Sequence, residues 1–362
     1  MRIFFFTPYP NGQSPSQRFR FEQYSILLKE KHALTQWSFL PLRQWKTFYS
    51  QGLLLQKCRL LIVGTTSRLV QLFKLRHSSH IFIHREITPI GPPVFEWIIA
   101  KVLQKKIIYD FDDAIWLTDR ASESKIERAL RWRSKVGTIC KWSYKVSCGN
   151  EYLARYARQY NANVVINPTT IDTENLHNPL VYDKASLKKQ NRLNGPVIGW
   201  TGSHSTLKYL EKLYPVLRQL QDRHPQVALL VIADRPPAFQ LKNLIFKKWA
   251  KETEIVDLML ADIGIMPLPD DEWTKGKCGF KALQYLALQI PCVASPVGIN
   301  STIVKHGETG FLAASDEQWL SCLYQLIHDE ALRERMGTAG RCLVEKHYSI
   351  KANTANFLSL FT

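Results

Sequence analysis

Two lysines and a glutamine in the C-terminal half, Lys277, Lys281 and Gln284, are spaced by four and then three residues. In a helix that begins near Gly279, these three side chains would point the same way. Like charges four residues apart repel each other, and cations at a helix start oppose its dipole. The arrangement therefore gains most if an anion such as a diphosphate binds between the lysines. The alternative is an exposed basic helix face.

A loop of small residues, Thr201, Gly202 and Ser203, follows the predicted strand 197–200. Glycine lets a ligand approach the backbone closely, and the hydroxyl groups can bind it. We expect this loop to contact substrate. The alternative is that Ser205 simply caps the helix that follows.

A similar loop containing Gly12, Ser14 and Ser16 follows the first predicted strand, 2–6, and leads into a predicted helix over 18–31. Free backbone N–H groups at a helix start can bind an anion or a sugar hydroxyl. The loop lacks a G-x-G-x-x-G pattern, which disfavours a dinucleotide. The alternative is an ordinary loop with a Ser16 cap.

Three carboxylates, Asp110, Asp112 and Asp113, directly follow the predicted strand 107–109, and Arg85 directly follows the predicted strand 81–84. Such carboxylates repel unless a cation, an arginine or sugar hydroxyls share them. Asp110 and Asp112 formally match the D-x-D pattern that binds manganese in single-domain nucleotide-sugar enzymes. We favour pairing with Arg85 or with acceptor hydroxyls over a metal, and carboxylates at a helix start are the alternative.

These residues follow short β-rich runs that alternate with longer helical patterns in both halves of the chain. Such alternation predicts an α/β protein with two doubly wound, Rossmann-like parallel sheets. Ligands bind beyond the carboxyl ends of parallel strands, so we expect the chemistry to face a cleft between the domains. The predicted strands are 2–6, 60–63, 81–84, 107–109 and 164–166, then 197–200, 229–232, 263–266, 292–294 and 310–312.

The predicted domain boundaries follow from a polar stretch and from the helical patterns. Residues 172–195 read as a linker. Leucines between Leu207 and Leu220 form one apolar stripe of a helix, and residues 150–160 form another helical pattern. We expect a first domain over 1–178, a second domain over 179–345 and a C-terminal segment over 346–362.

The composition is that of a globular protein, with 45% hydrophobic and 22% charged residues in a chain of 362. It excludes a disordered chain, a collagen-like repeat and a disulfide scaffold. The seven cysteines form no C-x-x-C pair, which argues against structural zinc and favours a reducing, cytoplasmic location. No apolar run reaches the roughly 20 residues of a membrane span.

The net charge of +17 calls for a partner. Basic and aromatic residues alternate in the expected helical segments 97–106, 128–145 and 242–251, as they do in peripheral segments on an anionic membrane. Solvated helix faces are the alternative. Nucleic acid is disfavoured because no helix-turn-helix, zinc-finger or RNA-recognition pattern is present.

Residues 277–300, KCGFKALQYLALQIPCVASPVGIN, and 306–312, HGETGFL, resemble the donor-binding segment of glycosyltransferase family 4. The family is also similar at QRFRFEQY, YDFDDAIW, GNEYLARYA and IGWTGSHST, in this order along the chain. The resemblance implies a GT-B architecture, with two Rossmann-like domains and a nucleotide-sugar in the cleft. It implies that residues 1–178 bind the acceptor, that residues 179–345 bind the nucleotide-sugar, and that a C-terminal helix within 346–362, here 351–361, returns to the first domain.

The chain departs from this family at several positions. Many members carry two acidic residues that hold donor hydroxyls, and here these positions are Gly276 and Gln284. Gln284 can still exchange hydrogen bonds with a ribose diol. The arginine and lysine that usually grip the diphosphate are replaced by Trp200 and Ser205. We expect Lys277 and Lys281 to substitute for them, in a lysine–glutamine variant of the family.

The resemblance implies transfer of a sugar from a nucleotide diphosphate to a hydroxyl acceptor with retention, without an obligatory metal or cofactor. The expected acceptor is a lipid-linked or surface-polysaccharide intermediate at the inner membrane face. The alternative is a non-catalytic nucleotide-sugar binder or membrane scaffold. The expected catalytic residues are Lys277, Lys281, Asp112, Asp113 and Arg85, and the expected substrate-binding residues are Gly12, Ser14, Ser16, Thr201, Gly202, Ser203, Gln284 and Asn300.

Overall fold

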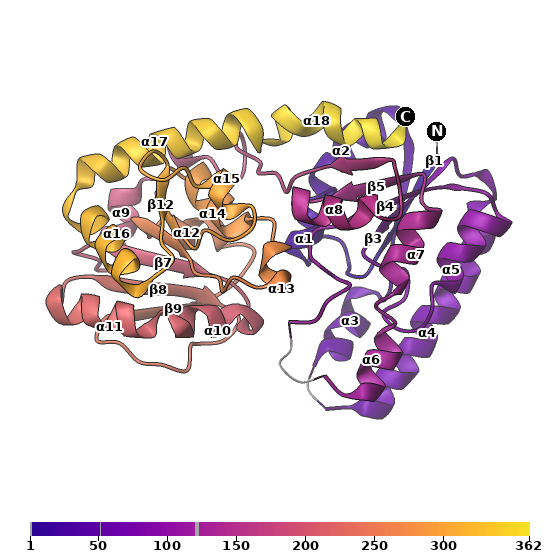
Figure 1. Cartoon of the computed structure of the whole chain (residues 1–362), viewed down its shortest axis with the longest axis horizontal. Helices are drawn as coiled ribbons and strands as arrows, with labels where there is room; N and C mark the ends of the chain where they lie inside the picture. Colours follow the sequence, from indigo (N-terminus) through magenta and orange to yellow (C-terminus); the bar gives the residue numbers. More distant parts are fainter. Residues whose placement is uncertain (1, 51, 120–122) are drawn as a thin grey trace. The chain divides into compact units, whose positions relative to one another are not determined.

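The computed structural model describes residues 2–50, 52–119 and 123–362 and divides into two compact units (Figure 1). The first unit contains the chain up to Thr169 together with two later pieces, Gly276–Cys278 and Asn353–Thr362. The second unit contains Thr170–Lys275 and Gly279–Ala352. The predicted α/β class with two parallel sheets is confirmed, and the functional assignment of each domain stays a prediction.

The first unit is built on a six-stranded parallel sheet in the order β2-β1-β3-β4-β5-β6. Its central strands are continuous apolar runs because helices cover both faces of such a sheet. Strand order reverses between β1 and β3, which marks the place where ligands bind in sheets of this kind. The strands are β1 (Arg2–Thr7), β2 (Ala33–Ser38), β3 (His80–His84), β4 (Lys106–Phe111), β5 (Lys145–Cys148) and β6 (Val164–Ile166).

Nine α-helices and four short turns belong wholly or partly to the first unit, within the residues described. The last of the helices begins in the second unit and ends in the first, as expected for a C-terminal helix that returns. The helices are α1 (Pro15–Arg18), α2 (Ser25–Lys31), α3 (Leu42–Tyr49), α4 (Leu54–Phe73), α5 (Val94–Trp97), α6 (Lys125–Arg131), α7 (Lys135–Trp142), α8 (Glu151–Arg158) and α18 (Ile350–Leu358), with turns η1 (Glu22–Tyr24), η2 (Lys74–His77), η3 (Ile98–Val102) and η5 (Ser359–Phe361).

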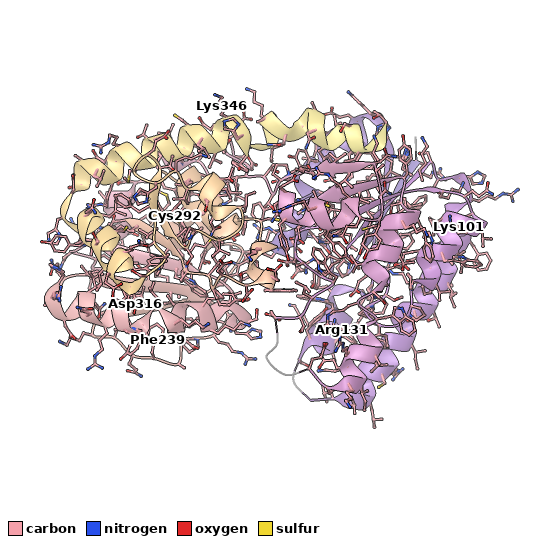
Figure 2. The ribbon with its side chains drawn as sticks, viewed as in Figure 1. Lys101, Arg131, Phe239, Cys292, Asp316 and Lys346 are labelled. Carbon is pink, nitrogen blue, oxygen red and sulfur yellow. The ribbon has the colours of Figure 1, made fainter. Side chains whose placement is uncertain are left out.

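The second unit has a six-stranded parallel sheet in the order β12-β11-β10-β7-β8-β9, which reverses between β7 and β10. Cys292 lies inside this sheet (Figure 2), where burial raises the pKa of its thiol well above the usual value. The strands are β7 (Val197–Thr201), β8 (Ala228–Ala233), β9 (Leu244–Lys248), β10 (Ile263–Met266), β11 (Cys292–Ala294) and β12 (Gly310–Leu312). The helices are α9 (Lys184–Gln190), α10 (His204–Lys212), α11 (Tyr214–Arg223), α12 (Glu254–Leu258), α13 (Glu272–Lys275), α14 (Phe280–Ala287), α15 (Asn300–Ile303), α16 (Asp316–His328) and α17 (Glu330–His347), with the turn η4 (Pro179–Val181).

Some expected elements are wrong. The run 60–63 is part of helix α4 rather than a strand, because a short apolar run does not distinguish the two by periodicity. The segment 242–251 forms the edge strand β9 rather than a helix, and lysines are common on such edges. The single helix expected around Leu207–Leu220 is two helices, since Pro215 lies at the start of α11. None of the described helices combines the length and the apolarity that a membrane crossing needs.

Candidate functional site

The loop after β1 lies at the carboxyl edge of the first sheet. Hydrogen bonds from nearby side chains hold this loop in place. Gln17 accepts a hydrogen bond from the Tyr9 backbone N–H at 3.0 Å and donates one to the Tyr9 carbonyl, also at 3.0 Å. Gly12 has a positive φ of 74° and donates its backbone N–H to Glu22 at 2.9 Å. Ser14, not Ser16, occupies the N-cap position of α1, so the predicted Ser16 cap is wrong. The two serine hydroxyls lie 2.9 Å apart.

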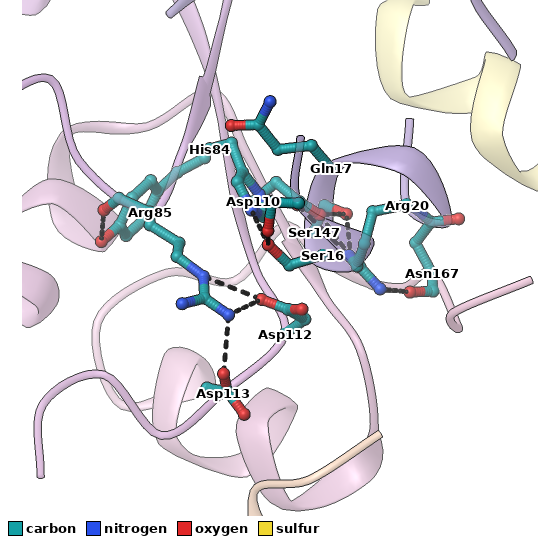
Figure 3. A network of polar contacts seen from close by, with 12 residues as sticks. Ser16, Gln17, Arg20, His84, Arg85, Asp110, Asp112, Asp113, Ser147 and Asn167 are labelled. Atoms are coloured by element: carbon teal, nitrogen blue, oxygen red, sulfur yellow. Dashed lines mark hydrogen bonds and ion pairs between the residues drawn. The ribbon is translucent and has the colours of Figure 1, made fainter. Parts of the chain in front are cut away.

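The carboxylate of Asp110 is fully buried at the end of β4 and forms the centre of a polar network (Figure 3). Arg20 forms an ion pair with it, Ser147 donates a hydrogen bond at 2.6 Å and His84 Nδ1 lies 2.8 Å away. Burial alone raises the pKa of Asp110, but the charge of Arg20 and the hydrogen bond with His84 outweigh burial and hold the pKa well below its usual value. Both carboxylate oxygens of Asp110 are therefore occupied by contacts inside the first unit, so Asp110 and Asp112 do not form one metal-binding pair in this structure.

The imidazole of His84 is oriented by this network. Because Asp110 is ionised, its oxygen can only accept, so His84 Nδ1 is the donor of this hydrogen bond. Nε2 then lies 3.4 Å from the hydroxyl oxygen of Ser16. A chain of polar contacts thus connects the buried carboxylate to the loop after β1.

Arg85 pairs with both of the remaining carboxylates, as the sequence predicted. Its guanidinium contacts Asp112 at 2.7 Å and Asp113 at 2.6 Å (Figure 3). Arg85 has a φ of 62°, a left-handed conformation that is rare outside glycine. Burial raises the pKa of Asp112, but the charge of Arg85 outweighs it and the pKa lies below its usual value. Asp112 is therefore held as an anion that accepts hydrogen bonds, and Asp113 shares the same guanidinium.

Lys277 belongs to this edge of the first unit. Its Nζ lies 2.9 Å from Asp113 Oδ1. The segment Gly276–Cys278 that carries it is fixed by Asn150, whose side-chain amide donates to the Lys277 carbonyl at 3.0 Å, and by the Cys278 thiol, which donates to the Asp112 carbonyl at 3.1 Å. Helix α14 begins only after the left-handed Gly279, so the expected helical stripe does not include Lys277.

At the carboxyl edge of the second sheet, the loop after β7 presents backbone and hydroxyl groups. The backbone N–H of Thr201 donates to the Tyr285 hydroxyl at 3.0 Å, and that of Gly202 donates to the Ile232 carbonyl at 3.0 Å. The hydroxyls of Ser203 and Ser205 lie 2.8 Å apart. Ser203 is the N-cap residue of α10, so the alternative in which Ser205 caps this helix is wrong.

Lys281 on α14 lies beside this loop, with its ammonium 4.7 Å from the centre of the Trp200 ring. Trp200 is buried, and Gly202 packs against it so closely that a Cβ atom there would lie 2.5 Å from the indole. The indole that replaces the family's usual cation thus provides a surface for a cation from the neighbouring helix. Thr201, Gly202, Ser203 and Lys281 are therefore on the same edge of the second sheet.

Two other predicted residues of the second unit are buried. The side-chain amide of Gln284 donates to Glu254 at 3.3 Å and lies 3.3 Å from His177 Nε2. Asn300 donates to the Ser295 carbonyl at 3.1 Å, whereas its Oδ1 has no hydrogen-bond partner among the residues that the structure describes. Contact of either residue with a substrate stays a prediction.

Sequence reasoning missed three residues that shape the first edge, Arg20, His84 and Asn150. Arg20 lies within the segment QRFRFEQY, but a lone arginine on a helical pattern does not reveal a carboxylate 90 residues later in the chain. Asn150 was detectable, since asparagine immediately before a helical pattern is a strong N-cap signal, and its side chain accepts from the Leu153 N–H at 2.9 Å.

Residues 195–329 match the sequence model of a family described as "Glycosyl transferases group 1". The matched segment contains the loop after β7, Lys281, Gln284 and Asn300. It also contains Lys277, which packs in the first unit. No curated protein sequence matches the chain.

Solved structures with similar folds cover nearly the whole chain. A glycosyltransferase from Rickettsia africae is 14% identical with a TM-score of 0.70, over 99% of this chain and 97% of that one. The HepE protein of Anabaena in complex with UDP and glucose is 15% identical with a TM-score of 0.67, over 99% of both chains. The sucrose-phosphate synthase of Thermosynechococcus elongatus is 15% identical with a TM-score of 0.66, over 99% and 97%. The fold is that of GT-B proteins, and together with the family match it supports a glycosyltransferase.

Proposed function

We propose that this protein transfers a sugar from a nucleotide diphosphate sugar to a hydroxyl group of an acceptor. The observation that carries the proposal is the position of Thr201, Gly202, Ser203 and Lys281, which lie together at the carboxyl edge of the second sheet and within the segment that matches the family. Three of the similar solved structures contain UDP, UDP and glucose, or UDP-glucose, so UDP-glucose is the first donor to test.

The second unit would hold the donor. The hydroxyls of the loop after β7 would bind phosphate or sugar oxygens, because the backbone N–H groups of Thr201 and Gly202 already donate within the protein. The ammonium of Lys281 stabilises the charge that develops on the departing diphosphate, an effect worth about a hundredfold to a thousandfold in rate per group. Lys277 would add a second ammonium, and a diphosphate that reaches it must compete with Asp113.

The first unit would hold the acceptor. The carboxylate oxygens of Asp112 and Asp113 would accept hydrogen bonds from acceptor hydroxyls while Arg85 keeps them in place. In the reaction the bond between the anomeric carbon and the diphosphate oxygen breaks, and a bond to the acceptor oxygen forms. With retention, the acceptor proton passes to an oxygen of the leaving diphosphate. A lipid-linked or surface-polysaccharide acceptor at the inner membrane face fits the basic surface of this chain.

The test is donor turnover by the purified protein after a panel of UDP- and GDP-sugars has identified a donor that raises the melting temperature. In Lys281→Ala and Lys277→Ala we expect transfer or donor hydrolysis to fall about a hundredfold or more, with melting temperatures unchanged. Lys275→Ala is the matched control, because Lys275 pairs with Glu272 on an exposed surface. Full activity in both lysine variants contradicts the proposal.

A non-catalytic nucleotide-sugar binder is the second candidate, because Gly276 and the buried Gln284 replace the acidic pair of the family. The same experiment separates the two functions. A binder is stabilised by the donor but neither hydrolyses nor transfers it, with any acceptor in the panel.

A further inference from the structure

Helix α4 exposes a row of large apolar side chains to solvent, although it buries an arginine. The side chains of Leu55, Ile62, Leu69 and Phe73 are 87%, 65%, 48% and 86% exposed. Their spacing of seven, seven and four residues places them on one stripe of the helix, which we call the outer face of α4. Helix α4 runs along the outside of the first unit (Figure 1). A helix that faced only water would show the opposite pattern.

The opposite face of α4 is fixed to the sheet by Gly64, Arg68 and Leu72, which are buried. Arg68 donates hydrogen bonds to the carbonyls of Thr7 at 2.9 Å and Ile87 at 3.2 Å. A Cβ atom at Gly64 would lie 2.4 Å from the Phe39 ring, so the backbone packs directly on it. The helix therefore cannot rotate to bury its outer face without breaking these contacts.

The charge around the outer face has one sign. From Lys31 to Arg85 the sequence contains nine lysines and arginines and not one aspartate or glutamate. Arg59 on α4 and Lys74 and Arg76 immediately after it are exposed. Two copies of this face would bring like charges together, whereas a surface of phosphate head groups would neutralise them.

Helix α6 is a second element of the first unit that exposes apolar side chains beside basic ones, although it also contains Glu127. Ile126 and Leu130 are exposed, as is Trp132 directly after the helix. Arg128 and Arg131 lie on the same short helix (Figure 2). Tryptophan and arginine side by side are typical of the boundary between head groups and acyl chains.

We propose that the outer face of α4 docks on an anionic phospholipid bilayer, with its four apolar side chains among the acyl chains and Arg59, Lys74 and Arg76 on the head groups. Docking of this kind leaves the helix in the plane of the interface. Arg68 connects α4 to the carboxyl ends of β1 and β3, next to Arg85. Docking would therefore bring the edge proposed for the acceptor to the membrane, and this consequence alone rests on the proposed function.

The test is co-sedimentation of the full chain with vesicles of phosphatidylcholine alone or with phosphatidylglycerol. We expect binding to the anionic vesicles that weakens at high salt. The variant I62S/L69S/F73S should need about a hundredfold more lipid for half-binding, because each exposed apolar side chain that enters the membrane adds to the affinity. The matched control is L180S/V181S/Y324S, which changes three exposed apolar side chains of the second unit and should bind as wild type.

Unaltered binding by the α4 variant overturns the proposal, as does equal binding to neutral vesicles. A third outcome is possible, in which wild type is a dimer in analytical ultracentrifugation, the α4 variant is a monomer, and neither protein binds vesicles. That outcome also overturns the proposal, because the outer face of α4 would then contact a second copy of the chain. Since the exchanged side chains are exposed, melting temperatures of both variants should equal that of wild type. Vesicle binding by a protein without donor turnover contradicts the proposed transfer reaction and leaves the docking intact.

Discussion

The two sheets place their buried carboxylates at opposite ends. In the first unit, Asp110 lies at the carboxyl end of β4 and pairs with Arg20. In the second unit, Asp262 comes directly before β10, at the amino end, where Lys188 Nζ lies 2.7 Å away and the Val197 N–H donates at 2.9 Å. Burial raises the pKa of Asp262, but the charges of the nearby lysines outweigh it and lower the pKa.

The comparison separates carboxylates that hold a sheet together from carboxylates that are placed to bind a ligand. Ligands bind at the carboxyl ends of parallel strands, so the network around Asp262, at the amino end, is placed to hold the sheet together. The carboxyl edge of the second unit carries hydroxyls and Lys281, which would suit an anionic donor, beside Asp234, which pairs with His204. In the first unit Asp110 fixes the interior, and Asp112 and Asp113, which pair with Arg85, are the carboxylates that would suit the hydroxyl groups of an acceptor.

The largest expected effect is that of Arg20→Met on the first unit. The variant leaves Asp110 buried without its main charge partner, which destabilises a protein by about 3–5 kcal/mol. Hydrogen exchange measured by mass spectrometry should show faster exchange in β4 and slow exchange in β10. Arg218→Met is the control, since Arg218 lies on an exposed face 4.0 Å from Asp222. Unchanged exchange in β4 would mean that Asp110 does not depend on this pair.

Asp262→Asn tests the other side of the comparison. The variant removes the negative charge that pairs with Lys184 and Lys188. Its loss should lower the free energy of unfolding of the second unit by about 1–3 kcal/mol. Because Asp262 lies at the amino end of the strands, kcat/KM per folded molecule should stay within about twofold of wild type. A large fall in kcat/KM at full folding contradicts a purely structural role.

Gly202→Ala should weaken donor binding about tenfold to a hundredfold, because the added methyl group displaces the Trp200 ring on which Lys281 rests. The measurement is the dissociation constant of the donor nucleotide by calorimetry. Gly340→Ala is the control, since its Cβ would also crowd a side chain, 2.7 Å from Leu286, but within the helical layer. Equal loss of affinity in both variants would point to general destabilisation.

Acidification should have the smallest effect. The pKa of Asp110 is lower in the folded chain than in the unfolded chain, so its contribution to stability is present above the unfolded value near 4 and is lost as the pH falls. Between pH 5 and pH 3 this single group should account for about 1 kcal/mol of the free energy of unfolding. The measurement compares urea unfolding of wild type with Asp110→Asn, whose pH dependence should be weaker by this amount. Parallel curves would contradict the ion pair.

The fold was predictable because both sheets consist of buried parallel strands, which appear as continuous apolar runs. The strands 81–84, 263–266 and 292–294 are predicted almost residue by residue. The edge strands β2 and β9 were not predicted, because half-exposed strands such as Leu244–Lys248 mix lysine with apolar residues.

The positions of candidate residues were predictable where they lie at or just after the end of a strand, as Asp112, Asp113 and Thr201 do, and their roles stay a prediction. The positions were not predictable where a contact joins distant parts of the chain. The sequence places Lys277 four residues from Lys281, but the left-handed backbone at Gly279 separates them into two compact units. Likewise, nothing local shows that Gln284 turns inward to Glu254.

The last ten residues have a consequence for how the chain is made. Phe357 stacks on Tyr24 with ring centres 4.3 Å apart, and Phe361 lies against Phe82 at 6.2 Å. The ribosome therefore delivers the strands of the first unit long before residues 353–362, which complete the core of that unit only after the second unit has been synthesised. Until then the nascent first unit exposes an unfinished apolar surface around Tyr24 and Phe82, which makes it prone to aggregation during synthesis.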